Sequence, residues 1–441
     1  MGTIIKVKNS FKGGIHVPEY KELTEDKPIK SMPLPSRVTI YLQQHLGAPA
    51  KETVKVGDEV KTGQVIGEPS GFISAYVHSP ITGKVLEIKE TYHPLGTKSK
   101  AIIIEKTSDD EWIKIENTGI PDKLSRDEIL EIIKKAGIVG LGGATFPTHV
   151  KLNPPKDKKI DTLIINAAEC EPFLNVDNRL IIERTEDFIK GIKIILKLLP
   201  VKCYIGIEDN KPEAIKVLSE VIKKENNIDL FVLPTKYPQG GEKQLIYAIT
   251  KRVVPSGKLP FDVGVIVQNV STVIAIYEAV YKGKPLIEKV TTVSGDAINE
   301  PSNVKFRIGT SFEDIINFCG GYKKEPAKII MGGPMMGFAQ FTDKVGTIKG
   351  TSGILVFSEK IAKLPPIEPC IYCGRCVDAC PMGLAPVLMG KNIYVGNYLE
   401  AKKLNLLDCI ECGCCNYVCP ANRPLVQLFK YGKFMLRKMK K

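Results

Sequence analysis

The chain has 441 residues, of which 43% are hydrophobic and 25% are charged, and its formal net charge is +13 at pH 7. This length exceeds the size at which one hydrophobic core keeps growing, so we expect several domains. No apolar run approaches the roughly 18 residues of a membrane span, and the opening MGTIIKVKNSFKGG lacks the apolar stretch of a signal peptide. Both features predict a cytoplasmic chain without a transmembrane segment.

The positive charge is compatible with three kinds of partner: nucleic acid, an anionic membrane surface or an acidic protein. Basic residues concentrate in KYGKFMLRKMKK at 430–441, but elsewhere the lysines are spread out and form no recognisable base-reading module. We therefore expect no nucleic-acid function. A lysine-rich, solvated surface explains the composition equally well.

Residues 1–125 predict a small β-rich domain. The stretches VKVGDEVKTGQVIGE (54–68) and VHSPITGKVLEI (77–88) alternate with period two and are punctuated by glycine, which indicates a barrel or sandwich. The pattern resembles the biotinyl/lipoyl hammerhead, whose members carry a modified lysine at a hairpin tip. The corresponding segment here, SGFISAYVHSP (70–80), has no lysine. We therefore expect a structural or docking role, with neither biotin nor a lipoyl group.

Residues 126–285 predict a mostly parallel sheet covered by helices on both faces, a Rossmann-like α/β domain. Helical patterns, among them 126–137 and 179–199, alternate with short β-branched strands. The expected strands are 161–167, 203–208, 229–234 and 263–269. Ligands of such sheets bind at the carboxyl ends of the strands. The unusual residues at those ends lie in 166–171, 237–242 and 269–272.

The loop GIVGLGGATFPTHVK (137–151) follows a helix rather than a strand, so it is not the dinucleotide fingerprint of a Rossmann domain. Gly140, Gly142 and Gly143 would still expose backbone amides to a phosphate, and Lys151 would add positive charge. A tight structural turn is the alternative, and the local pattern leaves both interpretations open.

The acidic segment NAAECEPFLNVDNR (166–179) places Glu169 and Glu171 on either side of Cys170. In an extended conformation the two carboxylates would share one face and could bind a ribose, a flavin edge or a hydride donor. Two exposed acids after a strand are the alternative. No histidine lies nearby in the sequence to activate the thiol, so we interpret Cys170 as a packing or flavin-neighbouring residue.

The segment YPQGGEKQL (237–245) puts Gly240 and Gly241 at a predicted helix start. Free amides and the helix dipole make such a position suitable for an anion. An ordinary helix start, with Glu242 in the first turn, is the alternative.

Residues 286–362 predict strands around one helix, as in a β-grasp module. The helix-like segment is SFEDIINFCGG, and the strands and turns come from TTVSGDAINEP, KIIMGGPMMGF and GILVFS. We interpret MGGPMMG as a turn with methionine packing rather than as a cofactor loop.

Nine of the twelve cysteines lie in 370–419, and such clustering without a secretion signal indicates a metal site rather than disulfides. CIYCGRCVDACP and CIECGCCNYVCP both follow C-x2-C-x2-C-x3-C-P. This is the spacing of two-cluster bacterial ferredoxins, in which the fourth cysteine binds the other cluster. We therefore predict a ferredoxin-type domain with two [4Fe–4S] clusters and a basic tail over 363–441. A zinc site would instead have cysteines in pairs.

The predicted ligands form two sets. Cluster one takes Cys370, Cys373, Cys376 and Cys419, and cluster two takes Cys380, Cys409, Cys412 and Cys415. Cys414 falls outside the register, so we predict a buried packing residue and not a ligand. Such clusters pass single electrons and cannot accept a hydride, so a donor of electron pairs would need a converter, usually a flavin.

These motifs together carry a resemblance to known families. The whole chain resembles the C-type subunits of the Rnf ion-translocating oxidoreductase complexes, from SFKGGIHVP to the ferredoxin segment and NRPLVQLFKYGK. The middle and β-grasp parts are similar to the NADH-binding flavoprotein subunit of respiratory complex I. The matching stretches are GLGGATFPTHVK, NAAECEPFLNVDNRLI, YPQGGEKQL, NVSTV and the β-grasp module, which resembles the soluble-ligand-binding β-grasp (SLBB) family.

The resemblance implies a cofactor site at the strand ends of the middle domain. Contacts with FMN would fall on Gly140, Gly142, Gly143, Lys151, Asn166, Asn269 and Thr272. Contacts with NADH or the flavin edge would fall on Glu169, Glu171, Tyr237, Gly240, Gly241 and Glu242. The flavin would be non-covalent, because GGATFP is not a covalent-flavin motif. Hydride transfer to FMN needs no acid–base residue, so none is assigned.

The resemblance further implies a peripheral subunit on the cytoplasmic side of the membrane, passing electrons between NADH, FMN and two [4Fe–4S] clusters. Its partners would be the membrane subunits and, through the complex, ferredoxin. The basic tail and the unmodified hammerhead would dock it. Two alternatives stay open: a cobalamin reductase of the propanediol-utilisation type, and a non-catalytic iron–sulfur electron wire with an empty nucleotide fold.

Overall fold

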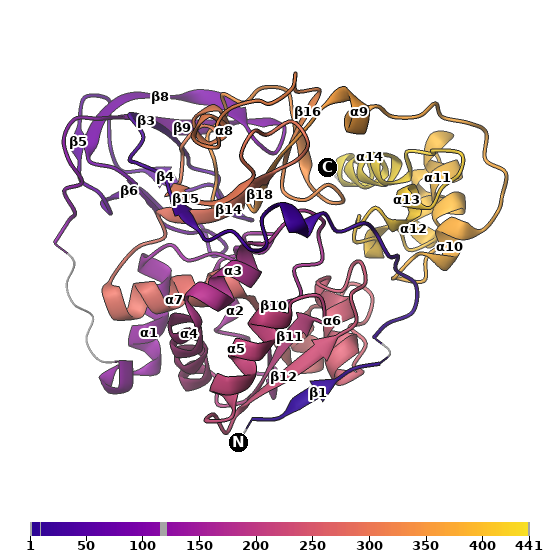
Figure 1. Cartoon of the computed structure of the whole chain (residues 1–441), viewed down its shortest axis with the longest axis horizontal. Coiled ribbons are helices and arrows are strands. Elements are labelled where there is room, and N and C mark those ends of the chain that lie inside the picture. The colour runs from indigo at the N-terminus through magenta and orange to yellow at the C-terminus, as the bar shows by residue number, and fades with distance from the viewer. Residues whose placement is uncertain (1, 9, 115–120, 440–441) are drawn as a thin grey trace.

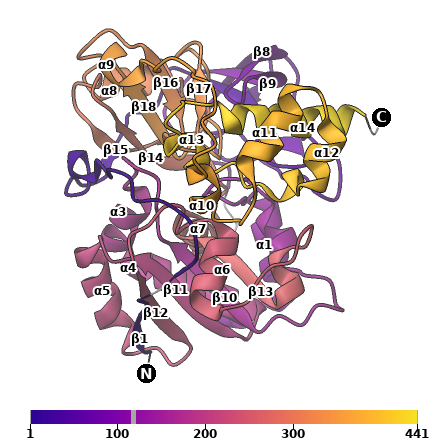
Figure 2. The same cartoon turned by 90° about the vertical axis from the view of Figure 1, so that its right-hand side faces the viewer.

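The computed structural model describes residues 2–8, 10–114 and 121–439. The strands of the described residues form sheets of five, six, four and three strands. Figure 1 shows the five-stranded sheet with its helices in the lower half, the other sheets above it and the C-terminal helices to the right. In Figure 2, which looks from the right-hand side of Figure 1, the C-terminal helices lie in front, mostly over the upper half.

The lower half is a five-stranded parallel sheet, which confirms the predicted strand–helix alternation. Its strands, in spatial order, are β1 (Ile4–Lys6), β12 (Ile228–Leu233), β11 (Lys202–Glu208), β10 (Thr162–Ala167) and β13 (Val265–Asn269). The chain builds β10, β11 and β12 in one direction and then returns to place β13 on the other side of β10. The carboxyl ends of β10 and β13 therefore form a topological switch point, where ligands bind in such sheets.

Helices cover both faces of this sheet. They are α1 (Arg126–Lys135), α2 (Thr148–Lys151), α3 (Val176–Glu183), α4 (Thr185–Leu198), α5 (Pro212–Ile222), α6 (Glu242–Thr250) and α7 (Val270–Lys282). Residues of α6 share a core with Ile164, whereas those of α1, α3, α4, α5 and α7 share one with Leu163 and Ile165. Successive side chains of β10 thus face opposite helical layers.

The single helix predicted over 179–199 is wrong. The structure has two helices, α3 and α4, because Arg184 leaves the helical region at φ −133° and ψ 37°. Its guanidinium pairs with Asp187, at 2.7 Å, and with Glu278 of α7, at 2.8 Å. These tertiary contacts outweigh a helical propensity that is continuous in the sequence.

The N-terminal β unit consists of two antiparallel sheets around one core, which confirms the predicted barrel-sandwich. One sheet has the order β3 (Arg37–Tyr41), β9 (Thr97–Lys106), β8 (Gly83–His93) and β5 (Glu59–Val60), and the other β4 (Lys51–Glu52), β6 (Val65–Glu68) and β7 (Val77–His78). Apolar residues of both sheets, such as Val38, Ile66 and Val85, fill the space between them.

The β-grasp unit is a six-stranded mixed sheet that packs on one helix, α8 (Phe312–Phe318), as predicted. Its strand order is β17 (Phe338–Gln340), β16 (Lys328–Met331), β18 (Gly353–Phe357), β14 (Glu288–Ser294), β15 (Ser302–Arg307) and β2 (Lys30–Ser31). A short helix, α9 (Glu359–Ala362), follows and leads to the cysteine-rich part.

The start of the chain does not belong to the N-terminal β unit. Strand β1 joins the parallel sheet and β2 joins the β-grasp sheet. Between them the amide of Gly14 donates to the carbonyl of Ala379 (3.0 Å), and Ile15 and Tyr237 exchange backbone hydrogen bonds. We call residues 2–8 and 10–31 the N-terminal strap. The strap therefore contacts three other units: the parallel sheet, the β-grasp sheet and the cysteine-rich unit.

The cysteine-rich unit is helical. Its helices are α10 (Arg375–Asp378), α11 (Pro386–Tyr394), α12 (Tyr398–Lys403), α13 (Cys414–Tyr417) and α14 (Leu425–Lys438). The expected basic tail at 430–441 is, as far as Lys438, the second half of α14. This half is no free tail, because Gly432 and Leu436 are buried while Arg437 and Lys438 are exposed.

Candidate functional site

The glycine-rich loop between α1 and α2 lies at the switch point. The amide of Gly140 donates to the carbonyl of Phe146 (2.9 Å), and the amide of Leu141 donates to the hydroxyl of Thr272 (2.9 Å). Among the described residues, the amides of Gly142 and Gly143 have no hydrogen-bond partner. A Cβ on Gly143 would meet no atom, whereas one on Gly142 would lie 2.9 Å from Asn269. The loop therefore offers two free amides, as a phosphate site needs.

Asn269 ends β13 and is fixed in orientation. Its side-chain oxygen accepts the amide of Thr272 (3.4 Å), and its side-chain nitrogen donates to Asp177 (2.6 Å). Asp177 also accepts the hydroxyl of Ser271 (3.0 Å). Burial raises the pKa of Asp177, and the nearby carboxylate of Glu169 adds to the rise. Sequence reasoning missed Asp177, although an acid in the first turn of a helix is a detectable signal.

Lys151 and Asn166 connect the strand ends to the Gly-Gly segment. The ammonium of Lys151 pairs with Glu242 (2.9 Å) and donates to the carbonyl of Val267 (2.8 Å). The amide of Asn166 donates to the carbonyl of Gly240 (2.8 Å). The structure thus brings together residues predicted from three separate segments.

The two acids after β10 do not share a face. Glu169 has a left-handed backbone (φ 47°), and its carboxylate accepts the amides of Asp177 (2.7 Å) and Asn178 (3.1 Å) at the start of α3. The carboxylate of Glu171 instead accepts the amides of Met335 (3.1 Å) and Met336 (3.0 Å), in the turn between β16 and β17. Burial raises the pKa of Glu171 to about 7. The extended arrangement and the alternative of two free acids are therefore both wrong.

The amides predicted to be free in the Gly-Gly segment are engaged. Gly240 donates to the sulfur of Cys170 (3.2 Å) and Gly241 to the carbonyl of Pro238 (3.0 Å). Enclosure raises the pKa of the Cys170 thiol, which keeps it protonated and inert, in line with a packing role. Tyr237 is 2% exposed, and its hydroxyl donates to the carbonyl of Cys412 (2.8 Å).

Two buried amide side chains near this edge lack partners. The nitrogen of Gln268 and both polar atoms of Gln239 make no hydrogen bond to any described residue. Buried polar groups are normally paired, so these three atoms are exceptions among the described residues. Lys289 of β14 was also missed: its ammonium donates to the carbonyl of Leu141 (3.0 Å) in the glycine-rich loop, and burial lowers its pKa. The free amides of the glycine-rich loop and the ammonium of Lys151 fit the phosphate of a cofactor such as FMN.

The cysteines gather around two cavities. A cavity of about 330 Å³ is lined by Cys370, Cys373, Cys376 and Cys419. A second, of about 20 Å³, is lined by Cys380, Cys409, Cys412 and Cys415, together with Cys414. This grouping is the crossed one that the ferredoxin spacing predicts. No set of described ligand atoms converges on a single ion, but a cubane keeps its thiolates at separate corners.

The two cysteine runs have the same backbone geometry. Tyr372 and Glu411 have positive φ (54° and 58°), and Gly374 and Gly413 begin α10 and α13 with φ of 78° and 83°. Backbone amides point at sulfur from Leu384 to Cys380 (3.4 Å), from Glu411 to Cys409 (3.4 Å) and from Arg423 to Cys419 (3.5 Å). Such bonds stabilise thiolates and help to set cluster potentials. The donor set therefore fits iron–sulfur clusters.

The second cavity adjoins the carboxyl edge of the parallel sheet. The hydroxyl of Tyr237 donates to the backbone carbonyl of Cys412, and the side chain of Gln244 of α6 donates to the carbonyl of Pro381 (3.3 Å). The carbonyl of Met335 lies 3.1 Å from where a Cβ on Gly413 would stand. Cys414 is fully buried, with its sulfur 3.9 Å from the carbonyl of Tyr237. Its position fits the predicted packing role, at the junction of the two units.

Comparison with known proteins agrees with this architecture. Models of four families match: "RnfC Barrel sandwich hybrid domain" over residues 9–109, "Nuo51 FMN-binding domain" over 133–278, "SLBB domain" over 290–339 and "4Fe-4S dicluster domain" over 367–420. Together the fold and these matches define a flavin-domain iron–sulfur protein of electron transport.

Two curated relatives extend along nearly the whole chain. The C-type subunit of a proton-translocating ferredoxin:NAD(+) oxidoreductase complex, from Clostridium ljungdahlii, is 50% identical, covering 96% of this chain and 93% of its own. The corresponding subunit of a Na(+)-translocating ferredoxin:NAD(+) oxidoreductase complex, from Acetobacterium woodii, is 44% identical, covering 96% of both. The chain belongs to this family, the C-type subunits of ion-translocating oxidoreductase complexes.

Solved structures share the fold. A chain of an NAD+-reducing [NiFe]-hydrogenase in the H2-reduced state superposes with a TM-score of 0.50 at 18% identity, over 72% of this chain and 65% of its own. Within the described ranges, the helices are all too short or too polar to cross a membrane.

Proposed function

We propose that this chain is the subunit that exchanges electrons with NAD(H) in a membrane-bound, ion-translocating ferredoxin:NAD+ oxidoreductase complex. The names of the two relatives support the assignment, and so do the matched FMN-binding and dicluster families. One structural observation carries it furthest: the cavity of the second cysteine set adjoins the strand ends where the free amides lie, through the Tyr237–Cys412 hydrogen bond.

The strand-end residues would hold FMN. The free amides of Gly142 and Gly143 and the ammonium of Lys151 would bind the phosphate, while Gly140 and Thr272 keep the loop in shape. Asn166 and Asn269, each held by a hydrogen bond, would orient the ring. When bound, FMN accepts an electron pair from NADH and releases single electrons.

The nucleotide would lie beside the flavin edge. The residues proposed to border it are Glu169, Glu171, Tyr237, Gly240, Gly241 and Glu242. Hydrogen bonds within the chain hold this edge in place: Gly240 donates to the sulfur of Cys170, and the amides of Met335 and Met336 donate to the carboxylate of Glu171. Preorganised groups lose less entropy on binding, which supports a positioning role for the whole edge.

The cysteines would order the electron path. The set of Cys380, Cys409, Cys412 and Cys415 lies against the sheet edge and would receive electrons first. The set of Cys370, Cys373, Cys376 and Cys419 lies farther out, where Ile371 and Tyr372 are 69% and 65% exposed. This outer set would pass electrons to a neighbouring protein of the complex.

Anaerobic mixing of the FMN-loaded chain with NADH tests the assignment. We expect the flavin absorbance to bleach while NADH is consumed, because the chain itself would bring donor and flavin together. A flavin that dithionite reduces but NADH leaves oxidised would contradict the proposal and favour an electron wire. Parallel runs with NADPH measure the preference between the two nucleotides.

We further propose that the exposed end of α14 helps to dock the subunit on the cytoplasmic face of the membrane complex. Deleting 430–441 would remove buried Gly432 and Leu436, so charge reversal is the cleaner test. The double substitution Arg437→Glu and Lys438→Glu is expected to lower recovery in the membrane fraction roughly tenfold or more, at about 1 kcal/mol per basic residue. The matched control reverses Lys402 and Lys403, an exposed basic pair at the end of α12. If the two double variants were recovered equally in the membrane fraction, the exposed end of α14 would have no role in docking.

A further inference from the structure

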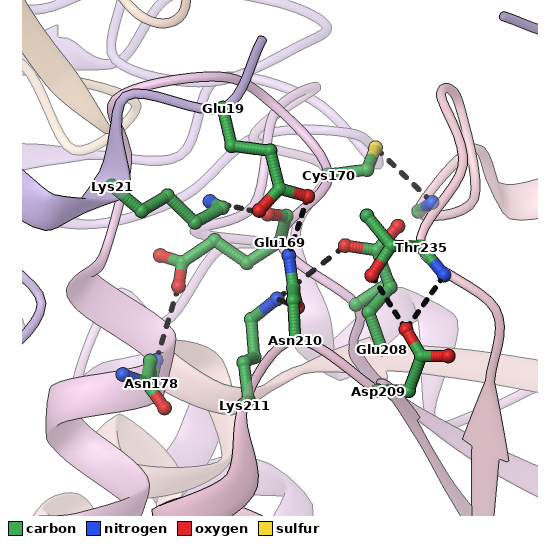
Figure 3. Close-up of polar contacts among 12 residues, drawn as sticks. Glu19, Lys21, Glu169, Cys170, Asn178, Glu208, Asp209, Asn210, Lys211 and Thr235 are labelled. Atoms are coloured by element: carbon green, nitrogen blue, oxygen red, sulfur yellow. Dashed lines mark hydrogen bonds and ion pairs between the residues drawn. The ribbon is translucent and has the colours of Figure 1, made fainter. Parts of the chain in front are cut away.

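Lys21 of the N-terminal strap is buried in the acidic segment after β10. Its ammonium donates to the carbonyl oxygen of Glu169 (2.9 Å), as Figure 3 shows. It also donates to the carbonyl oxygens of Glu171 (3.2 Å) and Leu174 (2.6 Å). Only 4% of the residue is exposed. An ammonium has three N–H donors, and three carbonyls satisfy all of them. The ammonium of Lys21 thus makes all three of these hydrogen bonds to the backbone of one short segment.

The segment that Lys21 contacts has a backbone that needs support. Glu169 and Phe173 both have positive φ (47° and 69°), a conformation that side chains other than glycine rarely adopt. Such conformations persist where surrounding contacts determine them. Residues 169–174 therefore depend on groups outside the segment to keep their shape.

The rest of the strap is joined to the same segment. The carbonyl of Glu19 accepts the amide of Phe173 (2.8 Å), and the ring of Tyr20 stacks on the Phe173 ring at 4.8 Å. Asn175 donates to the carbonyl of Lys21 (2.9 Å). These contacts place Lys21 at the centre of a joint between strap and segment.

A second set of polar groups joins the strap to the residues that follow strand β11. The carboxylate of Glu19 accepts the amide of Asn210 (2.8 Å), whose oxygen accepts the ammonium of Lys211 (2.7 Å). Lys211 also pairs with Glu208 at 3.4 Å, and both side chains are almost fully buried. Figure 3 shows this network between the strap and the strand ends. Lys21 is therefore anchored on the parallel sheet itself.

The segment under Lys21 touches both halves of the electron path. On the nucleotide side, the sulfur of Cys170 accepts the amide of Gly240. On the cluster side, Glu171 holds the turn of Met335 and Met336, which packs on Gly413 beside the second cysteine set. A shift of the segment would move both neighbours.

We infer that Lys21 is a positioning residue, which holds residues 169–174 in the shape that binds NAD(H) and supports the cluster ligated by Cys380, Cys409, Cys412 and Cys415. The inference deepens the proposed function and rests on it for its nucleotide part. Lys21 itself touches neither reactant: it acts through the three carbonyls. It makes no hydrogen bond to the glycine-rich loop, so the binding of the FMN phosphate by that loop should not depend on it.

The test compares Lys21→Met with Lys27→Met in the full chain carrying FMN and both clusters. Methionine fills the space of the lysine stem but donates no hydrogen bond. Lys27 is the matched control, because it lies on the same strap and donates to a backbone carbonyl, that of Pro301 (2.8 Å), but is exposed. We expect Lys21→Met to raise the KM for NADH roughly tenfold, as loss of ordered hydrogen bonds would, with kcat and FMN content nearly unchanged. Lys27→Met should match the wild type.

A second readout separates this inference from the proposed function. EPR-monitored redox titration with dithionite measures the potentials of both clusters without NADH. In Lys21→Met the potential of the cluster nearer Glu171 should shift, while that of the outer cluster stays. An unchanged KM together with unchanged potentials would overturn the role of Lys21. If NADH does not reduce the flavin of the wild-type chain, the proposed function fails. The cluster potentials of Lys21→Met then decide whether Lys21 positions the segment.

Folding of the variant is checked by iron, sulfide and FMN content and by thermal unfolding. Should Lys21→Met not fold, Lys21→Gln replaces it, since glutamine keeps a donor but is too short to reach three carbonyls. Two results would make Lys21 a residue of general stability and overturn the inference. One is that neither variant folds; the other is that kcat and FMN content fall as strongly as KM rises.

Discussion

Replacing Cys380 by serine is expected to remove the cluster held by Cys409, Cys412 and Cys415, and to spare the other one. From its position in the sequence alone, Cys380 would be grouped with Cys370, Cys373 and Cys376, because it belongs to the first run of cysteines. In the structure it lines the cavity of the second run. We expect iron per chain to fall from about eight to about four, with one of two reduced-cluster EPR signals lost.

The control for this variant is Cys414→Ala. Cys414 lies in the same cavity wall and is fully buried, but it stands outside the ferredoxin register. Both clusters should survive its loss. The reverse pattern, with Cys380→Ser removing the cluster of Cys370 and Cys373, would contradict the crossed assignment, and loss of a cluster in Cys414→Ala would make that thiol a ligand.

Replacing Lys151 by methionine is expected to weaken FMN binding about 10- to 100-fold. Loss of one charge-assisted hydrogen bond costs about 1.5–3 kcal/mol, which gives this range. Lys151 ends α2, beyond the free amides of the glycine-rich loop, and pairs with Glu242 at 2.9 Å. Quenching of FMN fluorescence on titration with the apoprotein measures the affinity.

Lys158→Met is the matched control for the flavin-binding test. Lys158 makes a similar ion pair, with Asp262 at 3.0 Å, but it lies outside the residues proposed to bind FMN. Its loss should leave the Kd for FMN unchanged. Equal affinities of the two variants would show that the pair of Lys151 and Glu242 is a surface contact, and would move the phosphate site elsewhere.

Short-range spacing was the most reliable signal in the sequence. The two cysteine runs predicted both sets of ligands, because a cubane fixes the distances between its thiolates, and the structure groups the same residues around its cavities. The ends of strands β10 to β13 were predicted to within about two residues, because short, buried runs of β-branched residues are typical of such strands. The sequence also predicted that the unusual residues lie at the carboxyl ends of the strands, whereas the order of the strands came only from the structure.

The backbone conformation of the segments between helices and strands could not be predicted from the sequence. Glu169 and Glu171 were expected to share a face, but the positive φ of Glu169 turns the backbone and sends the carboxylates to α3 and to the β-grasp turn. Nothing in the residue type requires that φ. It results from contacts made by distant segments, such as the three hydrogen bonds from Lys21.

The N-terminal strap shows the same limit for topology. Strands β1 and β2 have three and two residues, too few for a periodic signal, and their partners lie in distant parts of the chain, at β12 and β15. A local pattern therefore assigned them to the nearest β-rich region. The helical form of the basic end was also not predicted, because its charges are conspicuous while its buried residues, Gly432 and Leu436, are few.

The most direct test of the whole account is an anaerobic NADH titration of the chain, with and without FMN, followed by low-temperature EPR. We expect NADH to bleach the flavin and reduce both clusters in the FMN-loaded chain, and to reduce neither cluster without FMN. Clusters that stay oxidised with NADH and FMN present, yet accept electrons from dithionite, would contradict the central claim that one chain carries electrons from NADH to iron.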